Sequence, residues 1–256
     1  MGSQDTAPAG RDGRRARAFE DVLAQIERRI AEDGLTVGDR LPGERHLAEQ
    51  LGVSRASVRE ALRVLEALGV VSSQVGRGPD AGAVLTARPA TTLTDLLRLH
   101  LGLSSLSPRE VVETRMMIEQ WSAGRAAGRA APEPLARMRA ALDGMARAAT
   151  VEEFVRHDAS FHLTIAELSG NRLLAATMRA VRAAVEEHAV RAVRRLGTTE
   201  GLMADHHRIY EAIATGDGTA AIAAIAAHLA RAYPDTVPHD ARGGALPGRE
   251  AAEEPA

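Results

Sequence analysis

One carboxylate and three histidines in the second half of the chain are candidate metal ligands. Asp158 and His162 are four residues apart within Val151 to Leu168, a segment of helical periodicity, so both side chains project from the same helix face. That face lies at the edge of an apolar stripe, which turns both side chains toward the interior of a helical bundle. His206 and His228 each lie on or near the expected buried face of a later helix. Three imidazoles and a carboxylate suit a borderline divalent ion such as Zn²⁺, Ni²⁺ or Mn²⁺.

Taken singly, each of these histidines could equally be an ordinary core or surface residue. His157 and His207 are sequence neighbours of the candidate ligands, but each is rotated by about 100° from the required direction and is left out. The chain contains no cysteine. Disulfides, thiolate metal ligands and a cysteine nucleophile are therefore excluded.

Two short helices joined by a tight turn are predicted near the amino terminus. Apolar residues recur at helical spacing in both, namely Leu47, Ala48, Leu51 and Val53, then Val58, Leu62, Leu65 and Leu68. Between the helices, Gly52 can adopt a left-handed conformation, and Ser54 can cap the second helix. This pattern predicts a helix-turn-helix.

The outward side of the second helix carries Arg55, Ser57, Arg59 and Arg63. An arginine fork can bond guanine edges or phosphate oxygens, so this helix is predicted to read DNA. After Gly69 the pattern changes to two short β-type runs, 70–72 and 83–85, around a glycine-rich hairpin with Arg77 at its tip. A first helix at 18–31 completes a winged helix-turn-helix.

The remaining composition predicts a mainly α protein whose second half is an all-helical bundle of six or seven helices. Apolar spacing from residue 93 onward is helical, and the segment has no βαβ alternation, phosphate loop or Ser-His-Asp pattern. We expect five segments: a disordered arm (1–17), the winged helix-turn-helix domain (18–86), a linker (87–92), a helical metal-, effector-binding and dimerisation domain (93–233), and a disordered tail (234–256).

From its bulk properties we expect a cytoplasmic protein, but these properties do not by themselves indicate DNA binding. No window is as apolar as a membrane span, and the first residues lack the layout of a signal peptide. The net charge is −2, and arginines and acidic residues are balanced over residues 1–77. A field that attracts DNA must therefore be local to the exposed arginines of the reading head.

The stretch LPGERHLAEQLGVSRASVREALRVLEALGVV resembles the GntR superfamily of bacterial transcription regulators. It matches the family's P-x-E-R, L-A-x-x-L-x-V-S-R and V-R-x-A-L-x-x-L motifs. The resemblance implies that Arg45, Arg55 and Arg59 make the main DNA contacts and that Ser54 and Ser57 assist them. It also implies that Gly76 lets the wing, with Arg77, approach the minor groove. Arg45 and Arg63 could instead be solvated charges.

The second half resembles the FCD effector domain of the FadR-type branch of that family. The resemblance rests on Asp158-x-x-x-His162, Ser169-Gly170-Asn171, His206, Ala212-Ile213 with Gly216-Asp217, and His228-Leu229. It implies that Asp158, His162, His206 and His228 bind a metal. The segment Glu113-Thr114-Arg115-x-x-x-Glu119 resembles the first sensor helix, which implies that Arg115 anchors an effector carboxylate and that Asn171 helps to line the cavity. Arg115 could instead pair with Glu119 on its own helix surface.

These patterns together predict a transcription regulator and not an enzyme. A homodimer on a palindromic operator is expected because one recognition helix reads few base pairs. A small carboxylate effector would modulate DNA binding, with relieved repression as the expected sign. The alternatives are a metal-dependent hydrolase or lyase, and a regulator whose metal is structural or is itself the signal.

Overall fold

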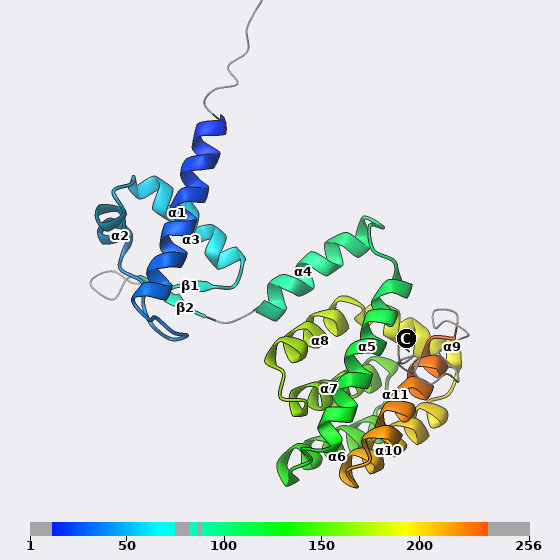
Figure 1. Ribbon diagram of the computed structural model, residues 1–256. Helices are drawn as coiled ribbons and strands as arrows, with labels where there is room; N and C mark the ends of the chain where they lie inside the picture. Colours follow the sequence, from blue (N-terminus) through cyan, green and yellow to red (C-terminus); the bar gives the residue numbers. More distant parts are fainter. Residues whose placement is uncertain (1–11, 75–81, 87–88, 235–256) are drawn as a thin grey trace, which may run out of the picture. The chain divides into compact units, whose positions relative to one another are not determined.

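The structure is a computed structural model that describes the backbone of residues 12–74, 82–86 and 89–234 (Figure 1). The chain divides into two compact units between Thr92 and Leu93. Both units are built mainly from helices, which confirms the predicted fold class. None of the helices in these ranges is long and apolar enough to cross a membrane.

The first unit packs three helices against a two-stranded antiparallel sheet. Its elements are α1 (Asp12–Glu32), α2 (Glu44–Leu51), α3 (Arg55–Ala67), β1 (Val71–Gln74) and β2 (Gly82–Leu85). Val71 pairs with Leu85 in the sheet. The helices and the sheet share one core, which includes Val22, Ile26, Leu47, Val58 and Leu65. Packing of α1 and α2 on α3 leaves the opposite side of α3 in solvent.

The turn before α3 has the predicted geometry. Gly52 lies in the left-handed region with φ 64°, and the Ser54 side chain accepts a hydrogen bond from the Ser57 backbone N–H at 3.1 Å. Leu68, the last apolar residue of this series, does not join the core. Leu68 is 45% exposed because α3 ends there and the chain turns away toward β1.

Two boundaries differ from the sequence-based expectation. Residues 12–17 were expected in a disordered arm but form the first turns of α1. They lack apolar periodicity, but alanine and arginine are strong helix formers and extend a helix whose later turns are packed. Residues 89–92 were expected in the linker but begin α4 (Pro89–Gly102), where Pro89 suits a first helical position.

The second unit contains eight helices in its described part, one more than the largest number expected. After α4 come α5 (Pro108–Ala127), α6 (Pro132–Arg147), α7 (Val151–Leu168), α8 (Arg172–Ala184), α9 (Glu186–Leu196), α10 (Glu200–Ala214) and α11 (Gly218–Ala232). The additional break falls at Val185, which separates α8 from α9 without any glycine or proline to signal it.

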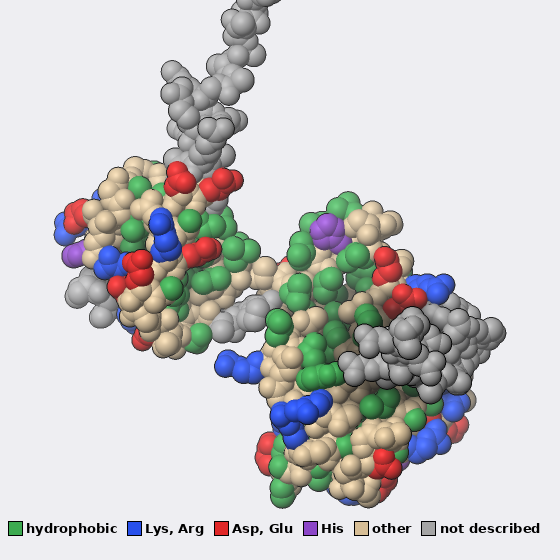
Figure 2. All heavy atoms as spheres, in the orientation of Figure 1, with side chains coloured by type: hydrophobic (Ala, Val, Ile, Leu, Met, Phe, Trp, Pro, Cys, Tyr) green, Lys and Arg blue, Asp and Glu red, His purple; other side chains and the backbone are tan. Residues whose placement is uncertain are grey.

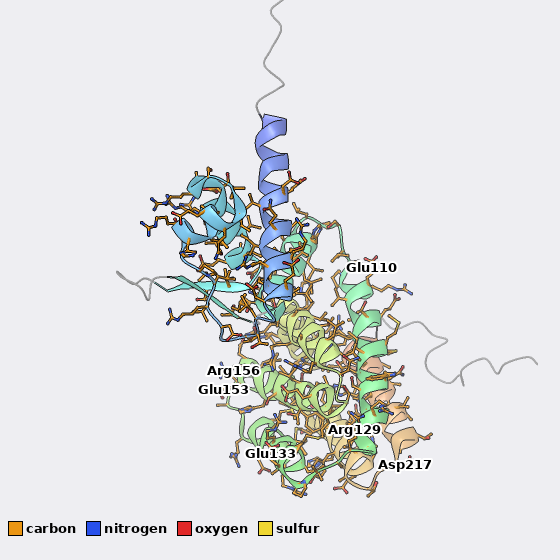
Figure 3. All side chains as sticks on the ribbon, turned by 60° about the vertical axis from the view of Figure 1, so that its left-hand side comes forward. Glu110, Arg129, Glu133, Glu153, Arg156 and Asp217 are labelled. Atoms are coloured by element: carbon orange, nitrogen blue, oxygen red, sulfur yellow. The ribbon has the colours of Figure 1, made fainter. Side chains whose placement is uncertain are left out.

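Helix α5 is central to the second unit because α7 and α11 pack along it (Figure 1). Its start is fixed by a capping box in which Ser107 and Glu110 satisfy each other's backbone N–H groups. Asp217 caps α11 in a similar way by accepting from the Ala220 N–H at 2.8 Å. Figure 3 labels Glu110 and Asp217 at the starts of these two helices. The caps fix where α5 and α11 begin and so which residues face the interior.

Candidate functional site

The second unit brings Asp158, His162, His206 and His228 together from α7, α10 and α11. One donor atom from each lies within 4.8 Å of all the others. His206 Nε2 is 2.8 Å from Asp158 Oδ1, and His162 Nε2 is 3.3 Å from His206 Nε2 and 3.5 Å from Asp158 Oδ1. The three histidines are buried, and the Phe161 ring packs edge-on against His162 and His206.

This donor set fits a divalent metal. With metal–nitrogen distances of about 2.0–2.1 Å, two donors at neighbouring tetrahedral or octahedral positions are separated by about 3–3.5 Å. The three separations above lie close to that range. His228 completes the set, because one of its ring nitrogens also lies within 4.8 Å of the other three donor atoms.

Burial and neighbouring charges set the protonation of the cluster. Burial lowers the pKa of His206 and places that of His228 well below its ordinary value, so both rings are kept neutral with a lone pair available. Burial opposes a charge on His162 as well, but the carboxylates of Glu119 and Asp158 outweigh it and raise the His162 pKa. Burial also opposes ionisation of Asp158, yet Arg182 and His162 hold its pKa well below the usual value.

A buried ion pair on α5, between Arg115 and Glu119, contacts the Nδ1 side of the His162 ring. Glu119 Oε2 lies 2.7 Å from His162 Nδ1, and Glu119 Oε1 lies 3.0 Å from Arg115 Nη2. Arg115 also donates to the Tyr233 hydroxyl at 3.0 Å. The pairing of Arg115 with Glu119 therefore occurs, but in the interior and not on the helix surface. A carboxylate behind a metal-ligating imidazole fixes its ring orientation, so Glu119 is placed to orient His162.

Sequence reasoning missed three charged residues around the cluster. Glu119 was considered only as part of a motif and as a partner of Arg115. Arg182 binds Asp158 Oδ2. Asp205 is buried, pairs with Arg231 at 2.7 Å and lies 4.0 Å from His228 Nδ1. Arg182 and Asp205 sit beside apolar positions of α8 and α10 that are themselves buried. A charged residue in a buried stripe was the signal that could have identified them.

Asn171 does not line the interior. It is exposed, and its side-chain oxygen accepts hydrogen bonds from the backbone N–H groups of Leu173 and Leu174 at 3.1 and 3.2 Å. The expectation that Asn171 contributes to the effector cavity is corrected accordingly. Asparagine is a favoured cap, and this one serves the start of α8.

The candidate DNA contacts of the first unit lie on or near the exposed side of α3. Arg55 and Arg59 are exposed there, and Ser57 is half-buried beside the Ser54 hydroxyl at 2.9 Å. Arg59 Nη2 forms an ion pair with Glu44 Oε2 at 2.9 Å, which holds the pKa of Glu44 below its usual value.

The other candidate contacts do not lie on α3. Arg45, on α2, has a side chain that is 78% exposed and lies 3.8 Å from Glu49. Gly76 and Arg77 lie outside the described residues.

A capped, exposed helix in a helix-turn-helix, joined to an all-helical unit with a buried Asp/His cluster, is the architecture of a transcription regulator with its own sensor domain. Residues 19–79 match the family model of bacterial regulatory proteins of the gntR family, and residues 110–231 match the FCD domain. The chain belongs to the GntR family, in the branch that carries an FCD domain, as its motifs indicated.

Two similar proteins agree with this assignment. The regulator LutR of Bacillus subtilis is 32% identical over 202 residues, which cover 76% of this chain and 90% of LutR. A putative L-lactate dehydrogenase operon regulatory protein of Escherichia coli is 31% identical over 221 residues, or 83% of this chain and 84% of that protein. These relatives are transcription regulators, which confirms the prediction that the chain is not an enzyme.

The fold is shared with a solved structure, Streptococcus agalactiae GntR. The TM-score is 0.58 at 22% sequence identity, and the match covers 82% of this chain and 97% of the other. The arrangement of elements is therefore common to both proteins.

The buried ion pair behind His162 yields a stability prediction. Glu119→Gln removes the charge that compensates Arg115, and breaking a buried pair in this way lowers the free energy of unfolding by about 3–5 kcal/mol. Glu113→Gln is the matched control, because Glu113 forms an exposed pair with Arg109 on the same helix at 2.8 Å. Denaturant unfolding of chelator-treated protein, followed by circular dichroism, measures both. Equal losses in the two variants would contradict the role given to burial.

Proposed function

We propose that this regulator binds a palindromic operator as a homodimer in the cytoplasm and that a small carboxylate bound at its metal site changes its operator affinity. Repression relieved by the acid is the proposed sign. The observation that carries the proposal is the pairing, in one chain, of exposed arginines on a capped helix with a buried Asp/His cluster beside an arginine-lined cavity.

The DNA contacts are assigned to Arg45, Arg55 and Arg59, with Ser54 and Ser57 beside them. The first turn of α3 presents backbone N–H groups, which together with the helix dipole favour a phosphate at that end. Glu44 holds Arg59 in place through its ion pair, so Arg59 is oriented before DNA arrives. Gly76 and Arg77 of the wing are proposed to follow the adjacent minor groove.

Substitutions on α3 test this assignment. Arg55→Ala and Arg59→Ala are each expected to weaken operator binding by about 1–3 kcal/mol, since each removes a charged, multidentate contact. Arg63→Ala is the control, because Arg63 lies farther along the same helix and pairs with Glu60 at 2.7 Å. Fluorescence anisotropy with a labelled operator fragment at fixed salt gives the affinities. Unchanged binding in both Arg55→Ala and Arg59→Ala, with the fold intact, would overturn this surface.

The proposed dimer is supported by an apolar stripe on α4. Leu96 and Leu99 on α4 and Leu103, the residue after its end, are 49%, 59% and 67% exposed. Their spacings are three and four, and the Leu103 N–H still donates to the Leu99 carbonyl at 2.9 Å, so the three side chains follow one face. Hydrophobic side chains are visible at the surface over α4 in Figure 2. An exposed leucine stripe of this kind is suited to packing against an identical helix.

Light scattering coupled to gel filtration measures the oligomeric state. Wild-type protein is expected at the mass of two chains, and Leu99→Glu is expected to shift it to one chain because a carboxylate would be buried in the contact. Leu173→Glu, at an exposed leucine on α8, should remain dimeric. A monomeric wild type would contradict the dimer, and a dimeric Leu99→Glu would contradict the use of α4.

The metal site is assigned to Asp158, His162, His206 and His228, with Zn²⁺, Ni²⁺ or Mn²⁺ as candidate ions. When bound, such an ion supplies a Lewis-acidic site for a carboxylate oxygen. Arg115 is proposed to favour an anion nearby, and the fit of the four donors described above supports the assignment. One relative is named for the L-lactate dehydrogenase operon, so L-lactate is the first acid to test.

Metal content distinguishes a metal centre from a cluster of core histidines. His206→Ala is expected to lose the bound ion, because a buried ligand with the shortest contact to Asp158 is removed. His207→Ala, at the exposed neighbouring residue, is expected to keep it. Elemental analysis after dialysis against each metal in turn reports the stoichiometry, expected at about one ion per chain for four ligands of this kind. A wild type that retains no ion, or equal loss in the two variants, would contradict the assignment.

A further inference from the structure

A cavity of about 370 Å³ lies between α7, α8 and α9, and four arginines line it: Arg115, Arg156, Arg179 and Arg182. Its other walls are largely apolar and include Val155, Ala159 and Leu163, with Ser160 and Glu186 as polar groups. An apolar pocket with a few cationic groups in its walls is suited to a small organic acid.

Arg115 and Arg179 are paired with carboxylates, and Arg156 is largely exposed. Arg115 uses Nε and Nη2 on Glu119 and Nη1 on Tyr233. Arg179 pairs with Glu167 at 2.9 Å, and its side chain is 54% exposed. Arg156 lies in solvent near Glu153, as Figure 3 shows.

Arg182 differs from the other three. Its side chain is only 6% exposed, and Nη2 donates to Asp158 Oδ2. Its Nη1 is buried and has no hydrogen-bond partner among the residues that the structure describes. A buried guanidinium donor without an acceptor is unfavourable, whereas a carboxylate oxygen would form a strong charge-assisted bond with it.

We propose that Nη1 of Arg182 receives the carboxylate of the effector in this cavity, and that Arg115 positions the neighbouring groups without being the main anchor. The inference rests on the proposed function, since it assigns the contact for the same acid. The ligand class is a small organic acid whose apolar body packs on α7 and whose carboxylate points inward.

The same guanidinium then connects the ligand to the cluster. Nη2 of Arg182 holds Asp158 Oδ2, while Asp158 Oδ1 faces His206 and His162. Because the guanidinium is planar and rigid, a carboxylate drawn to Nη1 constrains the position of Nη2 and of Asp158. Arg182 is thus the residue through which an acid in the cavity acts on the proposed metal ligands.

Isothermal titration of the metal-loaded full chain tests this role, with L-lactate, glycolate, acetate and succinate as probes. Arg182→Lys keeps the charge but loses the fork, and it is expected to weaken the acid that binds best by about tenfold or more. Arg179→Lys is the control on the same helix and cavity, with less than a twofold change expected. Metal content measured on the same samples shows whether Asp158 keeps its place.

A second variant avoids any dependence on the folding of Arg182→Lys. Ala159→Leu fills the cavity wall and changes no charge, so it should abolish acid binding while metal content is retained. Unchanged acid affinity in Arg182→Lys or in Ala159→Leu would overturn the inference but leave an acid-responsive regulator standing. Failure of the wild type to bind any of the four acids would contradict the inference and the proposed effector together.

Discussion

The burial of a continuous chain of charges is the constraint on which the helical unit depends. Arg115, Glu119, His162, Asp158 and Arg182 follow one another from α5 through α7 to α8, each in contact with the next. Removing a charged group from water is strongly unfavourable unless an opposite charge and hydrogen bonds replace the solvent. Each of these side chains therefore depends on its neighbours to compensate its buried charge. An anion that enters the interior must change the contacts within this row of charges.

Arginine serves opposite purposes in the two units. On α3 the Arg59 guanidinium is exposed and is paired with one surface carboxylate, that of Glu44, so it can exchange this partner for phosphate at little cost. In the helical unit Arg115 and Arg182 are buried and fixed. The overall charge of −2 conceals this division, because DNA binding depends on where the arginines lie and not on their total.

Helical periodicity predicted what lies on a single helix and failed where partners come from different helices. The spacing of Asp158 and His162 placed them on one face of α7, and the turn at Gly52 with its Ser54 cap was read correctly. Arg182 could not be assigned to Asp158, because their contact depends on how α8 packs on α7. Asn171 was misjudged because a capping asparagine and a cavity asparagine look the same in sequence. The break at Val185 could not be predicted from the sequence, because it contains no turn-forming residue.

The melting temperature of the full chain across a set of small carboxylates, before and after chelation, tests the central claim most directly. A ligand that binds only the folded state raises the midpoint by mass action. If the buried cluster senses an acid, at least one carboxylate raises the midpoint, chelation abolishes the shift, and a divalent ion restores it. No shift with any acid, or a shift that survives chelation unchanged, would contradict an effector site that depends on the Asp158, His162, His206 and His228 cluster.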